Sequence, residues 1–385
     1  MASALPTACS SLGRRLWNST SPARPAAPMT SSKKSMVAAY AIICASACPM
    51  PGPAPTAASH PMSKDLMPDQ VAVDRFSVSL DRLVPATEAV GLAVSGGADS
   101  LALLLLANAA RPGMIQAVTV DHALRSDSAQ EARTVAAICL AHAIPHTILE
   151  AEWGEDVPDA NIEAAARKMR YAMIGNWAQR NDLAFVATAH HADDQAETLL
   201  MRLARGAGLS GLSGIREQRP LGDKVTLVRP LLDWEKVLLM ALVMRAGLPV
   251  ADDPMNDDDR FDRVQLRTAL KEAGFGDSRQ YANSARHLQR ADEALLWLTA
   301  TLAEKRLVGD RNKLVIDTRG LPDEITRRLL LAGFDRLGDR SPRGPDLERA
   351  MERLKGGGKA TLGKILVEMV DGRWHLSKAP PRKTV

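Results

Sequence analysis

The sequence predicts an α/β fold in its first part and an α+β domain in its last part, joined by a small helical linker. Between Val71 and Leu203, short apolar runs alternate with longer helical stretches, as in parallel βαβ units with right-handed crossovers. After Lys271 the alternation ends, and helical runs are followed by a hairpin with an Asp-Gly turn. We therefore expect an extension at residues 1–65, a domain at residues 70–270 and a second domain at residues 271–385.

The individual elements follow from the spacing of apolar residues. Buried strands are predicted at residues 89–94, 115–120, 146–150 and 183–188. Helices are predicted at residues 76–83, 100–109, 128–141, 161–179 and 192–203. In the last part we expect helices at 282–306, 324–337 and 345–354, a strand at 313–316, a flexible loop at 356–359 and the hairpin at 365–376. The first set makes a Rossmann-like parallel sheet, whose ligands bind beyond the carboxyl ends of the strands.

Composition argues against a membrane protein and against a disulfide scaffold. The longest apolar stretch, residues 36–48, is shorter than the roughly 18 residues of a membrane helix. The four cysteines, at positions 9, 44, 48 and 139, include no Cys-x-x-Cys pair typical of a zinc site. These features predict a protein of a reducing compartment, which we take to be the cytoplasm.

The net charge of +4 is unevenly distributed along the chain. Residues 71–280 hold 22 basic and 29 acidic side chains, whereas residues 281–385 hold 21 basic and 14 acidic ones. A basic C-terminal third is expected to contact a polyanion. The alternative is a solvated helical surface with an excess of arginine.

Residues 1–65 are rich in Ala, Pro and Ser and contain no acidic residue before Asp65, so we expect them to be disordered. Three explanations compete: an organelle transit peptide, a secretory signal, and a true start at an internal methionine. No clear order of basic, apolar and cleavage regions begins at Met1. We favour a start at Met62 and assign no chemistry to the extension.

Residues 95–100, Ser-Gly-Gly-Ala-Asp-Ser, form the most informative motif. A glycine-rich turn between a buried strand and a buried helix places backbone N–H groups around a phosphate. Ser95 and Ser100 add hydroxyl donors, and Asp99 could hold Mg²⁺ between phosphates. The lysine of most phosphate loops is missing. An ordinary strand–turn–helix connection capped by Asp or Ser explains the same residues.

Two weaker motifs follow. Asp121 and His122 end the second predicted strand, where they would face a nucleotide, although Asp121 could also cap a helix turn. Arg167 and Arg170 lie on one side of a predicted helix, with Glu163 spaced for an ion pair to Arg167. A solvated, salt-bridged face explains this pattern equally well.

An acidic block at residues 188–198 is the densest group of polar side chains. On a helix, His190, Asp194 and Glu197 would share a face, which could bind a metal ion or an ammonium group. The glycine-rich stretch at 205–214 is expected to be mobile. Farther along, three arginines on one helical face could contact a phosphate backbone or simply be solvated: Arg260, Arg263 and Arg267.

In their order and spacing, these blocks resemble the tRNA(Ile)-lysidine synthetases, a family of the PP-loop ATP pyrophosphatases. The resemblance runs from Ala89 to Arg267 and includes Arg-Pro-Leu-Leu at 229–232 and Asp-Pro-Met-Asn at 253–256. The basic C-terminal third is similar to the tRNA-contacting region of that family. Met255 and Val264 stand where the family usually has Ser and Asn.

The resemblance implies that ATP adenylates the C2 oxygen of the wobble cytidine in a tRNA(Ile) with a CAU anticodon, releasing pyrophosphate. The ε-amine of free L-lysine then displaces AMP and leaves lysidine, so that the anticodon reads AUA instead of AUG. ATP and Mg²⁺ are implied, with no bound organic cofactor and no membrane. The oligomeric state stays open, with a homodimer as one option.

The resemblance also implies roles for individual residues. ATP would be bound by Ala93, Val94, Ser95, Gly96, Gly97, Ala98, Asp99, Ser100, Asp121 and His122. The catalytic residues would be Asp99, which also holds magnesium, with Arg167, Arg170 and Arg205. Lysine would be bound by His191, Asp194 and Glu197, with Asp193 as a weaker candidate. The tRNA would be contacted by Arg260, Arg263 and Arg267.

Two other functions stay open on the sequence alone. A tRNA 2-thiolase of the same superfamily usually needs cysteines for sulfur transfer or an iron–sulfur cluster, and residues 70–270 contain only Cys139. A non-catalytic nucleotide-binding module would have no use for the acidic block.

Overall fold

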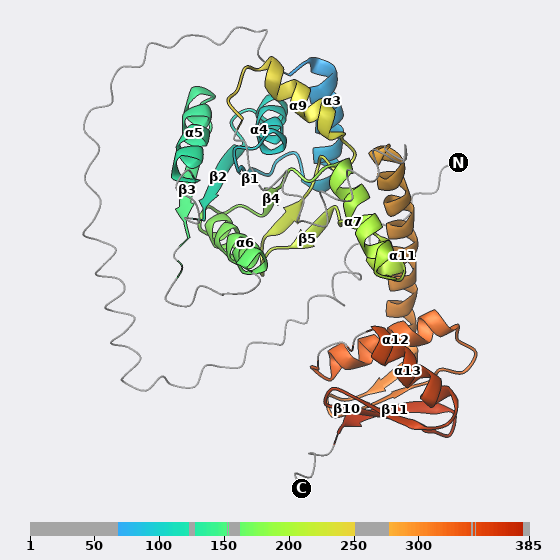
Figure 1. Cartoon of the computed structure of the whole chain (residues 1–385). Coiled ribbons are helices and arrows are strands. Elements are labelled where there is room, and N and C mark those ends of the chain that lie inside the picture. The colour runs from blue at the N-terminus through green and yellow to red at the C-terminus, as the bar shows by residue number, and fades with distance from the viewer. Residues whose placement is uncertain are drawn as a thin grey trace, which may run out of the picture. The chain divides into compact units, whose positions relative to one another are not determined.

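A computed structural model describes residues 68–122, 128–151, 153, 162–250, 277–339, 342 and 344–379 (Figure 1). The contacts divide it into two compact units, one ending at Asp292 and the other beginning at Glu293. Several predictions fall outside the described residues: the extension at 1–65, the positions Met255 and Val264, and the arginines 260, 263 and 267.

The first unit is built on a six-stranded sheet of order β3-β2-β1-β4-β6-β5. Five strands are parallel: β1 (Val90–Ala93), β2 (Ile115–Asp121), β3 (His146–Glu150), β4 (Phe185–Ala187) and β6 (Thr226–Val228). The sixth, β5 (Gln218–Pro220), is antiparallel to β6. The chain leaves β1 toward β2 and β3 and returns to the opposite side of β1 with β4. This confirms the Rossmann-like fold and places a ligand-binding switch point between β1 and β4.

Helices cover both faces of this sheet. The described helices from residue 68 to residue 250 are α3 (Gln70–Leu83), α4 (Ala98–Ala110), α5 (Ser128–Ala141), α6 (Ile162–Arg180), α7 (Ala192–Ala204), α8 (Leu209–Leu212) and α9 (Lys236–Arg245). Helices α3, α4, α5 and α9 share one core with β1 and β2. Helix α6 packs on the other face through Ile174, Trp177 and Ala178. A Cβ at Gly91 of β1 would lie 2.8 Å from the Trp177 ring, so this close approach requires glycine.

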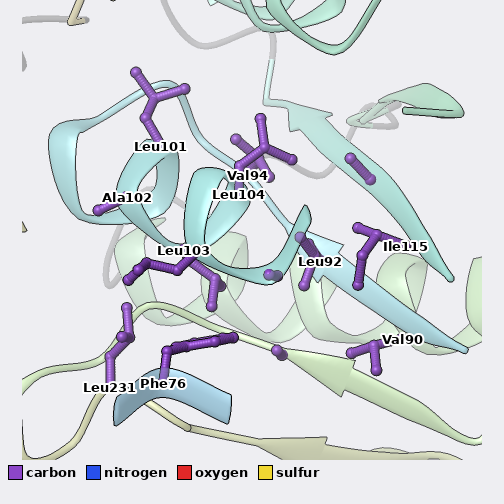
Figure 2. Packing of buried hydrophobic residues seen from close by; sticks show 14 of the residues in the cluster. Phe76, Val90, Leu92, Val94, Leu101, Ala102, Leu103, Leu104, Ile115 and Leu231 are labelled. Atoms are coloured by element: carbon purple, nitrogen blue, oxygen red, sulfur yellow. The ribbon is translucent and has the colours of Figure 1, made fainter. Parts of the chain in front are cut away.

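Helix α4 is buried on every side and fixes the start of the phosphate-loop motif. Leu101, Leu103 and Leu104 belong to one buried cluster with Phe76, Leu231, Val90 and Leu92. Figure 2 shows Leu103 close to Leu231 and Phe76. Full burial of a leucine side chain contributes about 1.5–3 kcal/mol. The N-terminal turn of α4, which carries Asp99, is therefore held by a rigid core.

The second unit combines helices with an antiparallel sheet of order β7-β8-β11-β10-β9. Helix α11 (Ser278–Arg306) spans the boundary between the units. It is followed by β7 (Leu307–Gly309), β8 (Lys313–Ile316), α12 (Asp323–Arg336), α13 (Gly344–Lys355), β9 (Lys359–Leu362), β10 (Ile365–Val370) and β11 (Arg373–Lys378). Asp371 and Gly372 have φ values of 48° and 72° in the β10–β11 turn, which confirms the predicted hairpin.

No helix among the described residues is long and apolar enough to cross a membrane. Cys139 is buried in α5, and burial raises the pKa of its thiol to about 11. Because the thiolate is the reactive form, this thiol is a poor nucleophile at neutral pH.

Candidate active site

The Ser95–Ser100 motif forms the turn from β1 into α4. Gly96 has φ 92°, a left-handed conformation that favours glycine. The Ser100 hydroxyl donates to the Gly97 carbonyl at 2.8 Å and accepts from the Ser95 backbone N–H at 3.1 Å. The Ser95 hydroxyl lies 3.3 Å from the same oxygen. The turn is thus locked at the N-terminus of α4, where unpaired backbone N–H groups and the helix dipole attract anions.

The acidic block meets this turn through His191, which immediately precedes α7. The His191 Nε2 atom lies 3.3 Å from Asp99 Oδ2 and 3.7 Å from Asp194 Oδ2. The His191 backbone N–H donates to Asp194 Oδ2 at 3.0 Å, which fixes the first turn of α7. Two motifs that are distant in the sequence therefore meet at the switch point between β1 and β4.

His191 is protonated at neutral pH in this environment. Burial lowers the pKa of its imidazole, but hydrogen bonds with Asp193 and Asp99, and the charge of Asp194, raise it to about 10. Asp193 also accepts the backbone N–H of Lys236 at 3.0 Å. Burial raises the pKa of Asp193, but the hydrogen bonds of His191 and Lys236 outweigh it and bring the pKa to about 2. Asp193 thus holds the start of α9 as well as His191.

The predicted face shared by His190, Asp194 and Glu197 does not form, because α7 begins at Ala192 and His190 precedes it. His190 Nδ1 instead lies 3.0 Å from the Thr188 hydroxyl. Asp194 and Glu197 are one helical turn apart in α7, and Glu197 is only 3% exposed. Among the described residues, no group of three His, Cys, Asp or Glu side chains is arranged to hold a metal ion.

Four arginines surround Tyr171, and three of them also lower the pKa of His190. The guanidinium carbons of Arg167, Arg170 and Arg219 lie 5.3, 5.7 and 4.2 Å from the centre of the Tyr171 ring. Arg229, which follows β6, is 4% exposed. Within the described part of the chain, none of the four forms an ion pair with a carboxylate. We call these four residues the arginine cluster.

The pKa shifts around the arginine cluster show its positive field. Burial raises the pKa of Tyr171, but the four arginines outweigh it and lower the pKa. The pKa of His190 falls well below 6.5, first through burial and then through Arg229, Arg167 and Arg170. Burial and Arg170 also lower the pKa of His122 at the end of β2, against the charge of Asp121. A concentration of guanidinium groups at the carboxyl edge of the sheet is suited to phosphate.

The structure brings most of the predicted site residues to this edge. Asp121 is 8% exposed at the end of β2, next to His122. Arg205 follows the last residue of α7 and is therefore separated from His191 by the length of that helix, about 20 Å. Sequence reasoning assigned no role to Tyr171, Arg219 or Arg229. Their grouping depends on the β5–β6 hairpin, which local sequence patterns do not reveal.

Asp99 suits a magnesium ion that also binds phosphates. Its Oδ1 atom is buried and has no hydrogen-bond partner within the described residues. Mg²⁺ typically binds one or two carboxylates together with substrate phosphates and water. Asp99 fits that mode, and a cage made wholly of protein ligands is not required.

Comparisons with known proteins show which family the chain resembles. Residues 71–273 match the family model described as the PP-loop domain. The tRNA(Ile)-lysidine synthase of Zymomonas mobilis is 41% identical over 303 residues, which cover 78% of this chain and 91% of that protein. The enzyme of the same name from Novosphingobium aromaticivorans is 41% identical over 315 residues, covering 81% of this chain and 95% of its own. Among solved structures, the U34-tRNA thiolase NcsA from Methanococcus maripaludis matches with 17% identity and a TM-score of 0.47, over 57% of this chain and 79% of that chain.

Proposed function

Since the chain belongs to the tRNA(Ile)-lysidine synthase family of ATP-using PP-loop enzymes, we propose that it joins L-lysine to C2 of the wobble cytidine of a tRNA(Ile) with a CAU anticodon. The product, lysidine, changes the codon that is read from AUG to AUA. The observation that carries the proposal is the 3.3 Å contact between His191 and Asp99, which joins the phosphate-binding turn to the acidic block.

In the first half-reaction, the O2 atom of the cytidine attacks the α-phosphorus of ATP and pyrophosphate leaves. Ser95, Gly96, Gly97 and Ser100 bind the leaving pyrophosphate through N–H and hydroxyl donors at the start of α4. Asp99 would hold Mg²⁺, which when bound neutralises phosphate charge. Adenylation converts a poor leaving oxygen into a good one, so that positioning and electrostatics supply most of the catalysis.

Positive charge at the carboxyl edge of the sheet supports this step. Arg167 and Arg170 neutralise the charge that develops on the phosphates, and Arg205 contacts phosphate farther from the reacting atoms. The remaining nucleotide contacts are polar groups at the end of β2 and backbone flanking the turn, from Asp121, His122, Ala93, Val94 and Ala98.

In the second half-reaction, the ε-amine of lysine attacks C2, and the bond between C2 and the AMP oxygen breaks. Asp194 and Glu197 bind the ammonium groups of lysine, and His191 fixes the position of Asp194. The ε-ammonium must lose a proton before it can attack, because the protonated form is not a nucleophile. We propose that a carboxylate of this pair accepts that proton.

We further propose that residues 271–385, together with Arg260, Arg263 and Arg267, contact the tRNA in the cytoplasm. The basic excess of residues 281–385 supports phosphate contacts. The target base must leave its stack to reach the turn, which costs a few kcal/mol and is least for a base in a single-stranded loop.

The test is a single assay with purified protein, ATP, labelled L-lysine and a tRNA(Ile) transcript with a CAU anticodon. We expect label in the tRNA, with one AMP and one pyrophosphate formed for each lysine incorporated. A parallel reaction with a labelled sulfur donor tests the thiolase alternative, for which the described chain offers only the buried Cys139. Sulfur incorporation without lysine incorporation would overturn the proposal.

A further inference from the structure

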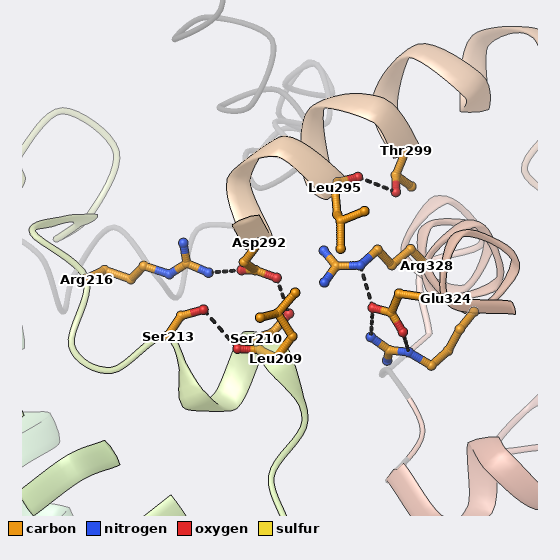
Figure 3. A network of polar contacts seen from close by, with 10 residues as sticks. Leu209, Ser210, Ser213, Arg216, Asp292, Leu295, Thr299, Glu324 and Arg328 are labelled. Atoms are coloured by element: carbon orange, nitrogen blue, oxygen red, sulfur yellow. Dashed lines mark hydrogen bonds and ion pairs between the residues drawn. The ribbon is translucent and has the colours of Figure 1, made fainter. Parts of the chain in front are cut away.

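A buried carboxylate outside the proposed site anchors the glycine-rich segment 209–216. Asp292 of α11 is 0% exposed. One of its oxygens accepts the Ser210 hydroxyl at 2.6 Å, and the other pairs with the Arg216 guanidinium. Figure 3 shows Asp292 between these two side chains, at the side of α8.

The same segment is bound to α7, the helix of the acidic block. The Gln195 side chain donates to the Ile215 carbonyl at 2.9 Å and accepts the Ile215 N–H at 2.6 Å. Arg202 donates to the carbonyls of Gly211 and Gly214 at 2.7 and 3.0 Å. Segment 209–216 is therefore defined by side chains from two helices and is not a free loop, contrary to the mobility expected from its glycines.

Segment 209–216 leads directly to the arginine cluster. The Arg216 carbonyl accepts a hydrogen bond from Arg229 Nη1, and the next carbonyl, that of Glu217, accepts the Arg229 backbone N–H at 2.9 Å. Arg229 in turn faces Tyr171, with which it shares a hydrogen bond, and lowers the pKa of His190. The chain of contacts thus runs from Asp292 through Arg216 to Arg229.

The buried ion pair between Asp292 and Arg216 is not expected to add much to the stability of the fold, because replacing such a pair with apolar residues of similar volume is often neutral or stabilising. Its geometry, in contrast, is specific, since Asp292 can satisfy both Ser210 and Arg216 only in one placement of the segment. We propose that Asp292 is a positioning residue that acts through Arg216 to hold Arg229 where the arginine cluster binds a phosphate group.

This inference rests on the proposed function for its catalytic consequence, but it has a consequence for binding that does not depend on lysine transfer. Inorganic pyrophosphate serves as the probe, and its dissociation constant can be measured by calorimetry on the full chain. The variants leave the turn at Ser95–Ser100 intact, so a difference in this dissociation constant between variants reports the contribution of the arginine cluster. Misplacement of a binding group by about 1 Å can lower a reaction rate about 100-fold. We therefore expect a misplaced Arg229 to weaken pyrophosphate binding by about tenfold or more.

The variants are chosen to separate positioning from folding. Asp292→Asn keeps the size of the side chain but removes its charge. Arg216→Met removes the guanidinium but keeps the backbone carbonyl that accepts from Arg229, and Arg216→Lys keeps the charge. Asp233→Asn is the matched control, because it removes the charge of a different carboxylate that pairs with an arginine of α11, Arg286.

We expect Asp292→Asn and Arg216→Met each to weaken pyrophosphate binding about tenfold and to lower kcat for AMP formation by a similar factor, with the KM for lysine within twofold. The double variant should bind pyrophosphate no more weakly than either single variant, since both changes interrupt the same chain of contacts from Asp292 to Arg229. Arg216→Lys should be within threefold of the original protein, and Asp233→Asn should be unchanged. A cooperative thermal unfolding transition, measured for each variant, will establish that the variant is folded.

The inference is overturned if both single variants bind pyrophosphate as the original protein does. It is also overturned if the double variant loses the product of the two single effects, because the two residues would then act independently. If the original protein incorporates no lysine while the differences in pyrophosphate binding persist, the proposed function fails and the positioning role stands.

Discussion

Replacing Glu197 with glutamine should weaken lysine binding about 10- to 150-fold and leave ATP binding nearly unchanged. Glu197 is 3% exposed in α7, and its neighbour Asp194 is held by the backbone N–H of His191. A hydrogen bond to a charged group contributes about 1.5–3 kcal/mol, and each 1.4 kcal/mol corresponds to a factor of ten. Glutamine keeps the shape and one carbonyl acceptor, so the change removes mainly the charge that attracts the ammonium group.

The assay measures the KM for lysine and the KM for ATP in tRNA-dependent AMP formation. A binding titration also measures the dissociation constant of lysine, because KM equals that constant only when the chemical step is slow relative to substrate dissociation. Asp193→Asn is the matched control in the same helix. Asp193 holds the Lys236 N–H, and asparagine retains that acceptor, so the KM for lysine should change less than threefold. Equal effects of Glu197→Gln on lysine and on ATP would refute the lysine pocket, as would a larger effect of Asp193→Asn.

Four other outcomes are expected. Asp99→Ala should abolish ATP-dependent incorporation of labelled lysine, and full activity in that variant would remove Asp99 from the mechanism. Deletion of residues 1–61 should leave the incorporation rate unchanged, whereas lost activity would make the extension part of the enzyme. Gly214→Ala should lower the free energy of unfolding in urea by about 3 kcal/mol, because φ at this position is +65° and the new Cβ would lie 2.3 Å from Gln195 Oε1. Gly206→Ala is the control: its φ is also positive, at +67°, but the space around it is open, so it should lower the free energy of unfolding by only about 1 kcal/mol. Hydrogen bonds from Arg327 and Arg328 lower the pKa of Glu324 against burial, so its stabilisation is present above the unfolded pKa of about 4.3 and is lost as the pH falls through the lowered pKa of the folded state. Glu324→Gln should therefore lower the urea midpoint at pH 7, and its difference from the original protein should shrink as the pH falls below about 4.3.

The sequence predicted those helices and strands that contain enough residues to show a clear period of apolar positions. The predicted bounds of α5, β3 and β8 agree with the structure, and α6 differs by one residue at each end. The strands β5 and β6 were not predicted, because three residues are too few to establish an alternation. Helix α9 was also missed, since its sequence is apolar on nearly all sides and has no clear period.

The site was predictable where its residues lie in one motif and not where folding assembles it. The turn at Ser95–Ser100 follows from six consecutive residues. The error at His190 has a local cause: the helix begins two residues later, after His191, so the assumed helical spacing did not apply. Arg219 and Arg229 reach Tyr171 only because the β5–β6 hairpin returns them to the sheet, and no short-range pattern contains that information.

Two adjacent histidines divide the site into halves of opposite charge preference. His190 faces the arginine cluster, and its pKa falls well below 6.5, whereas His191 faces three aspartates, and its pKa rises to about 10. The neutral ring of His190 adds no charge to the side that we propose binds phosphate. The protonated ring of His191 compensates part of the negative charge of Asp99, Asp193 and Asp194. The reaction that we propose brings an anionic adenylate close to lysine, whose ammonium groups bind as cations, and the turn between β4 and α7 supplies the two environments in consecutive residues.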